Sequence, residues 1–213
     1  MPDAFTATIG VLGLTGGVVA WLNYRKAVLW KRAELANNYL KDFNNNPELV
    51  FAGRCLDWNG GKLALPENLR AYMPNGEQFI QHDRRIFAIA LRADLKIHEM
   101  EDEPRIQIYR TSMDSFLSWL SLVASALDRK LFVVDDLQDV GYWAAKIQSE
   151  VAVHGFIVAF GYQESIEKLI RFYRSEKSAY QNWTFPVNTI AVEQIVGRER
   201  RQRVSDHDWS GDA

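Results

Sequence analysis

The sequence predicts an all-α fold, in which an N-terminal single transmembrane helix continues into a cytosolic helical bundle and a disordered C-terminal tail follows. Three observations support this. An early stretch is uncharged, the middle of the chain repeats apolar residues at helical spacing, and that spacing is lost toward the C-terminal part. We therefore expect a transmembrane anchor over residues 1–25, an all-helical domain over 26–180 and a mostly disordered tail over 181–213.

The uncharged stretch is the basis for the predicted anchor. It runs for 21 residues from Ala4 to Tyr24, which as a helix would extend about 31 Å and match the hydrocarbon core of a bilayer. Most of its polar members are Thr and Gly, which do not form the polar face of a water-exposed helix. Trp21 and Tyr24 stand where the lipid headgroups would begin, as interfacial aromatic residues often do.

Basic residues follow this stretch and none precedes it. A cleavable signal peptide has positive charge before its apolar run, so the order favours a retained anchor over such a signal. Positive charge stays on the cytoplasmic side, which predicts a single-pass protein of the plasma (inner) membrane with its N-terminus outside and its body in the cytoplasm. The remaining alternative is a soluble domain that buries its first helix. The membrane-surface basic residues are Arg25, Lys26, Lys31 and Arg32.

Small residues recur within the predicted anchor. Gly13 and Gly17 form a GxxxG pair, and Gly16 with Ala20 forms a second pair of small residues at the same spacing. Such pairs let two helices approach closely in lipid, which predicts a homodimer or docking on a partner's helix. Because glycine is common in membrane helices, the absence of any specific contact is the competing interpretation.

The first half of the body shows helical periodicity and helix boundaries. Apolar residues from Leu29 to Phe43 recur at spacings of three and four, which predicts that the first helix continues beyond the anchor. Asn46 and Pro47 match the N-cap and first position of a second helix, which ends near Asn59. We then expect a loop over residues 60–76, with a short turn at PENLRAYM, and a third helix from Glu77 to Ile97.

The second half carries the strongest periodicity, from Ile106 to Leu127, and an acidic connector, HEMEDEP, precedes it. Asp135 and Gln138 match a capping box that opens the next helix. A buried bend is expected at His154 and Gly155, and a last helix from about Gln163 to Ser178. No alternating strand pattern flanking a hairpin turn is identified, so we expect helices only.

The composition narrows the classes of function. The formal charge of −2 gives no overall attraction to nucleic acid. Cys55 is the sole cysteine, which rules out an intramolecular disulfide and a CxxC metal site. Its place on an apolar helix predicts a small core residue rather than a reactive thiol. We expect no cofactor.

The histidines do not complete a known metal site. His82-Asp83 resembles the dyad of helical HD-type phosphohydrolases, but those sites need an upstream histidine and none occurs before His82. A solvent-facing polar pair is the favoured interpretation. His98 lacks a second histidine four residues later, which an HExxH site needs. Phosphate-loop and serine-nucleophile motifs are missing as well, and Asp57-Trp58 and Asp114 are better explained as capping or solvated groups.

A second basic cluster lies in the predicted tail, within the heptapeptide GRERRQR. Without aromatic residues that could stack on bases, it is a poor nucleic-acid signature. A solvated tail is the simplest interpretation, and contact with anionic lipid or an acidic partner is the alternative. The arginines of this tail basic cluster are Arg198, Arg200, Arg201 and Arg203.

Together these features predict a membrane-anchored protein that contacts the lipid bilayer and another protein, and that serves as an interaction, scaffold or accessory/signalling subunit. No catalytic residues are assigned, and an enzyme is the less favoured class. The rival hypothesis is a membrane-tethered, metal-dependent helical hydrolase that uses His82, Asp83 and further carboxylates.

Overall fold

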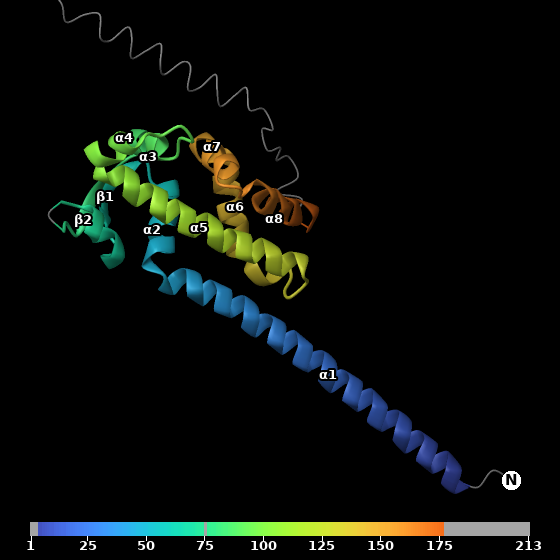
Figure 1. The fold of residues 1–213 in the computed structure, drawn as a ribbon. Coiled ribbons are helices and arrows are strands. Elements are labelled where there is room, and N and C mark those ends of the chain that lie inside the picture. The colour runs from blue at the N-terminus through green and yellow to red at the C-terminus, as the bar shows by residue number, and fades with distance from the viewer. Residues whose placement is uncertain (1–3, 75, 177–213) are drawn as a thin grey trace, which may run out of the picture.

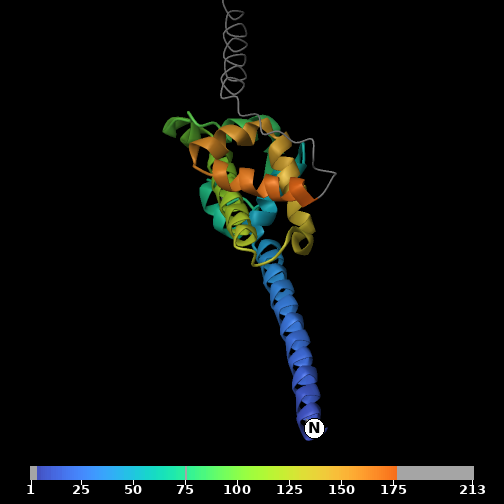
Figure 2. The same cartoon turned by 90° about the vertical axis from the view of Figure 1, so that its right-hand side faces the viewer.

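The computed structural model describes residues 4–74 and 76–176, and describes side chains from Gly16 to Arg174 within that range. The fold is mostly helical, which confirms the predicted class. One long helix, α1, projects away from a body formed by the other elements (Figure 1; Figure 2). The predicted tail, residues 181–213, lies outside the described residues.

The elements follow one another along the chain as α1 (Ala4–Asn45), α2 (Pro47–Asp57), β1 (Gly60–Ala64), the 3-10 helix η1 (Glu67–Tyr72), β2 (Phe79–Asp83), α3 (Arg84–Ala90), α4 (Ile97–Asp102), α5 (Pro104–Asp128), the 3-10 helix η2 (Val134–Leu137), α6 (Gln138–Ser149), α7 (Val151–Ala159) and α8 (Gln163–Glu176). The 42 residues of α1 correspond to a rod about 63 Å long.

The chain turns from α1 into the body at Asn46. The Asn46 side-chain oxygen accepts hydrogen bonds from the backbone N–H groups of Glu48 (3.0 Å) and Leu49 (3.4 Å). Pro47 occupies the first position of α2, where the backbone N–H that proline lacks would not form a hydrogen bond within the helix. This confirms the predicted boundary, because a single asparagine satisfies donors that the start of a helix leaves unpaired.

Helix α5 is the centre of the body, and α2, α3, α4 and α8 all pack against it (Figure 1). Most of its apolar residues from Ile106 to Leu127 are buried, as the periodicity predicts, whereas Leu122 is exposed. Arg110 connects α5 to the C-terminal ends of α3 and α7. Its guanidinium donates to the carbonyls of Ala90 (2.6 Å) and Arg92 (2.9 Å), and stacks over the rings of Phe156 and Phe160.

The expectation of helices alone is wrong at residues 60–83. Strands β1 and β2 form an antiparallel pair, with Gly60 opposite Asp83 and Ala64 opposite Phe79. In β2 the side chains alternate, so that Ile80 and His82 are buried while Phe79 and Gln81 are exposed. Part of the predicted loop over residues 60–76 is therefore a strand. The short turn predicted at PENLRAYM is confirmed as η1.

The third helix predicted from Glu77 to Ile97 is also wrong. Its first part is strand β2, and helix α3 begins only after Asp83, whose carboxylate accepts from the backbone N–H groups of Arg85 (2.7 Å) and Ile86 (3.3 Å). The acidic segment HEMEDEP is mainly helix α4 rather than a connector. The Glu99 side chain accepts from the backbone N–H of Lys96 (3.0 Å) and stabilises the start of that helix.

Two further boundaries differ from the predictions. Helix α7 runs through His154 and Gly155 without a bend, and the chain breaks instead at Glu150, between α6 and α7. The expected capping box at α6 is not found among the described residues, and Asp136 instead caps the start of η2, where its carboxylate accepts from the backbone N–H of Val133 (2.9 Å). The last helix, α8, matches its predicted position.

Candidate functional site

The projecting part of α1 carries the residues of the predicted anchor. Large apolar side chains along it are exposed, among them Val18 (56%), Trp21 (55%) and Trp30 (78%). Val19 (56%) and Leu22 (46%) are exposed as well, next to Val18 and Trp21. Among the side chains of α1 that the structure describes, Ala36 is the first that is strongly buried, and from there the helix packs on the body. In the part of the chain whose side chains the structure describes, which includes α1 from Gly16 onward, no helix is both long enough and apolar enough to span a membrane.

The small residues and basic residues of α1 take up separate positions. Gly16, Gly17 and Ala20 are exposed, and a Cβ atom added at either glycine would meet no atom within 4 Å. Gly13 lies outside the part of the chain whose side chains the structure describes. The tail residues Arg198, Arg200, Arg201 and Arg203 lie outside it as well. The predicted interhelical contact and tail contact therefore remain predictions.

The four basic residues beyond the uncharged stretch do not act alike. The guanidinium of Arg25 lies 5.0 Å from the Trp21 ring centre. Lys26 and Lys31 are exposed. Arg32 instead forms an ion pair with Asp136 of η2, with 2.9 Å between Nε and Oδ2. This ion pair therefore connects α1 to η2 of the body.

His82 lies in the core, so the expectation of a solvent-facing His82-Asp83 pair is wrong. Its side chain is 2% exposed, with 3.0 Å from Nε2 to the Trp58 carbonyl oxygen and 3.0 Å from Nδ1 to the Tyr109 hydroxyl. Because a carbonyl only accepts, Nε2 carries the proton and Nδ1 accepts from the Tyr109 O–H. The Tyr109 oxygen also accepts from the Asp83 backbone N–H (3.3 Å). Both ring nitrogens are thus engaged by the protein itself.

The hydrogen bonds to Trp58 and Tyr109 hold the His82 ring between β2, α2 and α5. Among the described residues, no three His, Cys, Asp or Glu side chains are grouped so that they could hold a metal ion. Cys55 is 1% exposed, as predicted for a core residue, and burial raises the pKa of its thiol. Arg84 next to it donates to the Cys55 carbonyl (3.1 Å) at the end of α2 and pairs with Glu150. These residues join α2, α3 and the α6–α7 junction.

His154 is the second buried histidine. It is 3% exposed, and its Nε2 lies 3.1 Å from the carbonyl oxygens of both Ile147 and Gln148 near the end of α6. Burial lowers the pKa of His154, and burial is also the main cause that lowers the pKa of His82. Both side chains are therefore held in the neutral form.

The lowered pKa values of His82 and His154 predict that the folded protein loses stability in mild acid. Their pKa values are lower in the folded than in the unfolded protein, so the unfolded chain binds more protons as the pH falls below about 6.5. Their contribution is complete above that pH and is lost below it. Urea unfolding at about pH 7.5 and about pH 5.5 measures the effect. The variants His82→Gln and His154→Gln should each flatten the dependence, and the exposed-site control His98→Gln should keep it. Equal dependence in all of them would contradict the assignment.

Other carboxylates predicted as capping or solvated groups make specific contacts. Asp57, at the end of α2, accepts from the Tyr142 hydroxyl and pairs with Lys146, whose Nζ is 3.2 Å away. The hydrogen bond with Asp57 raises the pKa of Tyr142 to about 12. Asp114 accepts from the Tyr162 hydroxyl (2.7 Å) and joins α5 to the turn before α8. These contacts explain the two carboxylates as structural groups.

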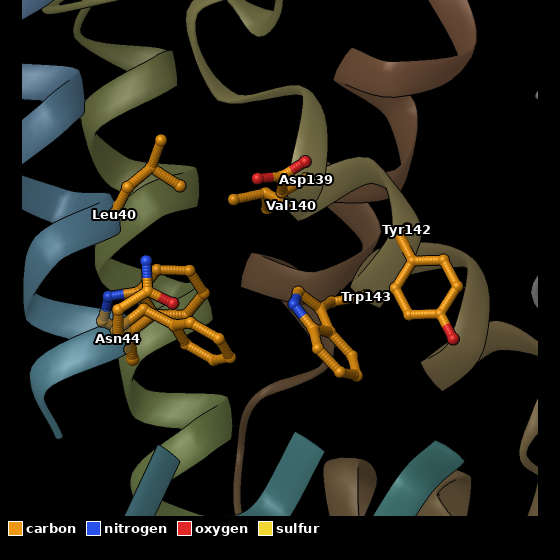
Figure 3. Close-up of a pocket in the computed structure, with 8 residues that line it drawn as sticks. Leu40, Asn44, Asp139, Val140, Tyr142 and Trp143 are labelled. Atoms are coloured by element: carbon orange, nitrogen blue, oxygen red, sulfur yellow. The ribbon is translucent and has the colours of Figure 1, made fainter. Parts of the chain in front are cut away.

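A pocket of about 270 Å³ opens where α1, α5 and α6 meet. Figure 3 shows Leu40 and Asn44 of α1 facing Asp139 and Trp143 of α6 across it, with Tyr142 on the far side of Trp143. Its walls are aromatic, and one wall residue, Trp119, is 7% exposed. The lining residues are Leu40, Phe43, Asn44, Trp119, Asp139, Val140, Tyr142 and Trp143.

Two of the residues that line the pocket carry a polar group without a hydrogen-bond partner among the described residues. The Nε1 of Trp119 is buried and has no hydrogen-bond partner among the described residues. Asp139 is exposed in the first turn of α6, and no ion pair or hydrogen bond of its carboxylate is found within the described part of the chain. Sequence reasoning missed this site, because its residues come from three helices far apart in the chain.

The comparisons with known proteins add no relative to this description. Protein-family models, curated proteins and solved structures were each compared with the chain, and none of them matches it.

Proposed function

We propose that this chain is a membrane-anchored interaction subunit, in which the N-terminal half of α1 lies in the bilayer and the helical body is held at the cytoplasmic surface. The observation that carries the proposal is the projection of α1 from the body with exposed apolar side chains (Figure 1; Figure 2). Leaving such side chains in water forfeits the free energy of burying them, about 25 cal/mol per Å². A bilayer would cover them.

The character of the helix favours insertion across a bilayer over adsorption on its surface. A helix that lies on a membrane has one charged face and one apolar face. In the stretch from Ala4 to Tyr24, apolar residues instead occur at adjacent positions, such as Val11-Leu12 and Val18-Val19, which lie on different sides of a helix, and the stretch has no charge. Arg25, Lys26 and Lys31 follow directly, which supports an orientation with the body in the cytoplasm.

The length of helix between the proposed span and the body sets how far the body stands from the membrane. About ten residues separate Tyr24 from the first packed residues, Leu35 and Ala36, so the body would stand about 15 Å from the edge of the bilayer. At that distance, with Arg32 paired to Asp136, the body would keep a defined direction relative to the membrane. A rigid spacer of this kind suits a subunit that presents a surface to another membrane-bound protein.

The body offers apolar surface for such a partner. Val151, Val158 and Phe160 on or next to α7 are between 44% and 54% exposed. Surface of this kind, if contiguous, is typical of protein-binding sites. Affinity capture from solubilised membranes, with the variant Val158→Asp as comparison, tests this part of the proposal. One protein captured with the parent chain and lost with the variant is the expected result, and identical recovery with both would contradict it.

The membrane part of the proposal is tested by charging the predicted span. The double variant Leu12→Arg with Leu14→Arg places two arginines near its centre, at a cost of about 5–7 kcal/mol for insertion. The control, Asn37→Arg with Asn38→Arg, changes two exposed residues of α1 beyond the predicted span. After a sodium carbonate wash, the parent and the control should stay in the membrane pellet, and the Leu12/Leu14 variant should move to the supernatant. Release of the parent chain would contradict the proposal.

A further inference from the structure

We propose that the pocket between α1, α5 and α6 binds a small organic cation of the choline type, meaning an N-methylated ammonium group. This inference does not depend on the membrane proposal, because it rests on the body alone. It is drawn from the rings that line the pocket and the carboxylate at its edge.

The rings supply the surface that an ammonium group prefers. Phe43 lies between two indoles, with centroid distances of 4.9 Å to Trp119 and 5.8 Å to Trp143, and both pairs are tilted rather than stacked. All three side chains line the pocket. The face of an aromatic ring attracts a cation, most strongly for Trp, and clusters of such rings are the usual cage for methylated ammonium groups.

The carboxylate of Asp139 gives the pocket its preference for positive charge. Figure 3 shows Asp139 and Trp143 on the same side, opposite Leu40 and Asn44. No basic side chain is among the residues that line the pocket. A cation held against the rings would therefore be attracted by Asp139 without competition from a basic residue in the lining. A ligand with a carboxylate or a phosphate in the same place would be repelled.

The size of the pocket favours a small ligand. Its volume of about 270 Å³ lies just below the range of about 300–1,000 Å³ for drug-sized ligands.

The first experiment compares choline with its neutral isostere, 3,3-dimethylbutan-1-ol, by titration calorimetry on the full chain in a maltoside detergent. Choline should bind saturably, and the isostere should bind at least about tenfold more weakly because it lacks the charge. Glycerophosphocholine is titrated in parallel, so that a lipid headgroup is distinguished from free choline as the source of the ligand. Equal binding of choline and the isostere, or no binding of choline in the millimolar range, would overturn the proposal.

Variants then test the roles of the individual residues, each checked by thermal unfolding for an intact fold. Trp143→Leu should weaken choline binding about tenfold, and Asp139→Asn about threefold. The control Asp102→Asn, at an exposed carboxylate of α4 outside the pocket, should leave binding unchanged. If Asp102→Asn and Asp139→Asn had the same effect, the attraction would be a property of overall charge and the site would be wrong.

Discussion

Replacing Phe116 with alanine is expected to lower the free energy of unfolding of the body by about 3–5 kcal/mol. Phe116 is completely buried in α5, and its ring makes edge-to-face contacts with Phe43 of α1 (6.1 Å) and Trp143 of α6 (5.6 Å). It therefore joins three helices at one point. The loss is large because the backbones of these helices cannot close the cavity that alanine would leave.

Urea unfolding followed by circular dichroism measures this effect. The matched control is Leu122→Ala on the same helix, because Leu122 is 60% exposed and its truncation leaves no cavity. We expect the control to change the stability by no more than about 0.5 kcal/mol. Equal destabilisation by the two variants would show that Phe116 does not occupy the core position assigned to it.

Removing the hydroxyl of Tyr109 is expected to cost about 1–3 kcal/mol of stability. This hydroxyl donates to His82 Nδ1 and accepts from the Asp83 backbone N–H, so Tyr109→Phe leaves two buried or half-buried polar groups without their partner. The phenylalanine ring fills the same space between Phe51 and Phe87, so lost packing contributes little. The effect therefore isolates the hydrogen-bond network.

Tyr72→Phe is the control for this change, because Tyr72 is exposed in the last position of η1. Its loss of a hydroxyl should leave the unfolding midpoint in urea nearly unchanged. The amide exchange of residue 83 gives a second measurement, since its N–H loses an acceptor only in Tyr109→Phe. A Tyr109→Phe protein as stable as the parent would contradict the buried network around His82.

The helices with long periodic sequences could be predicted, and the short elements could not. The α5 sequence repeats its apolar residues over many turns, and Asn46-Pro47 combines two helix-start signals, so both were found from local patterns. Strand β2 has only five residues, and a 14-residue connection that contains η1 separates it from β1. Without a tight turn between the strands, too few alternating positions remain to distinguish them from a helix.

The environment of His82 shows why the sites were harder to predict than the helices. The two groups that bond its ring come from Trp58 and Tyr109, 24 and 27 residues away in the chain. The sequence shows only that Asp83 and two arginines are its neighbours, which favours an exposed position. The aromatic pocket has the same property, since Phe43, Trp119 and Trp143 meet only after α1, α5 and α6 have packed.

Labelling of single cysteines tests most directly whether the N-terminal half of α1 lies in lipid. The variants are made in a Cys55→Ala background, because Cys55 is buried in the fold but would react once SDS unfolds the body. In membranes opened by freezing and thawing, Leu12→Cys should react with a water-soluble maleimide only after the bilayer is dissolved in SDS, and Asn37→Cys should react with and without SDS. Equal reaction of the two cysteines in intact bilayers would contradict the membrane-anchored account.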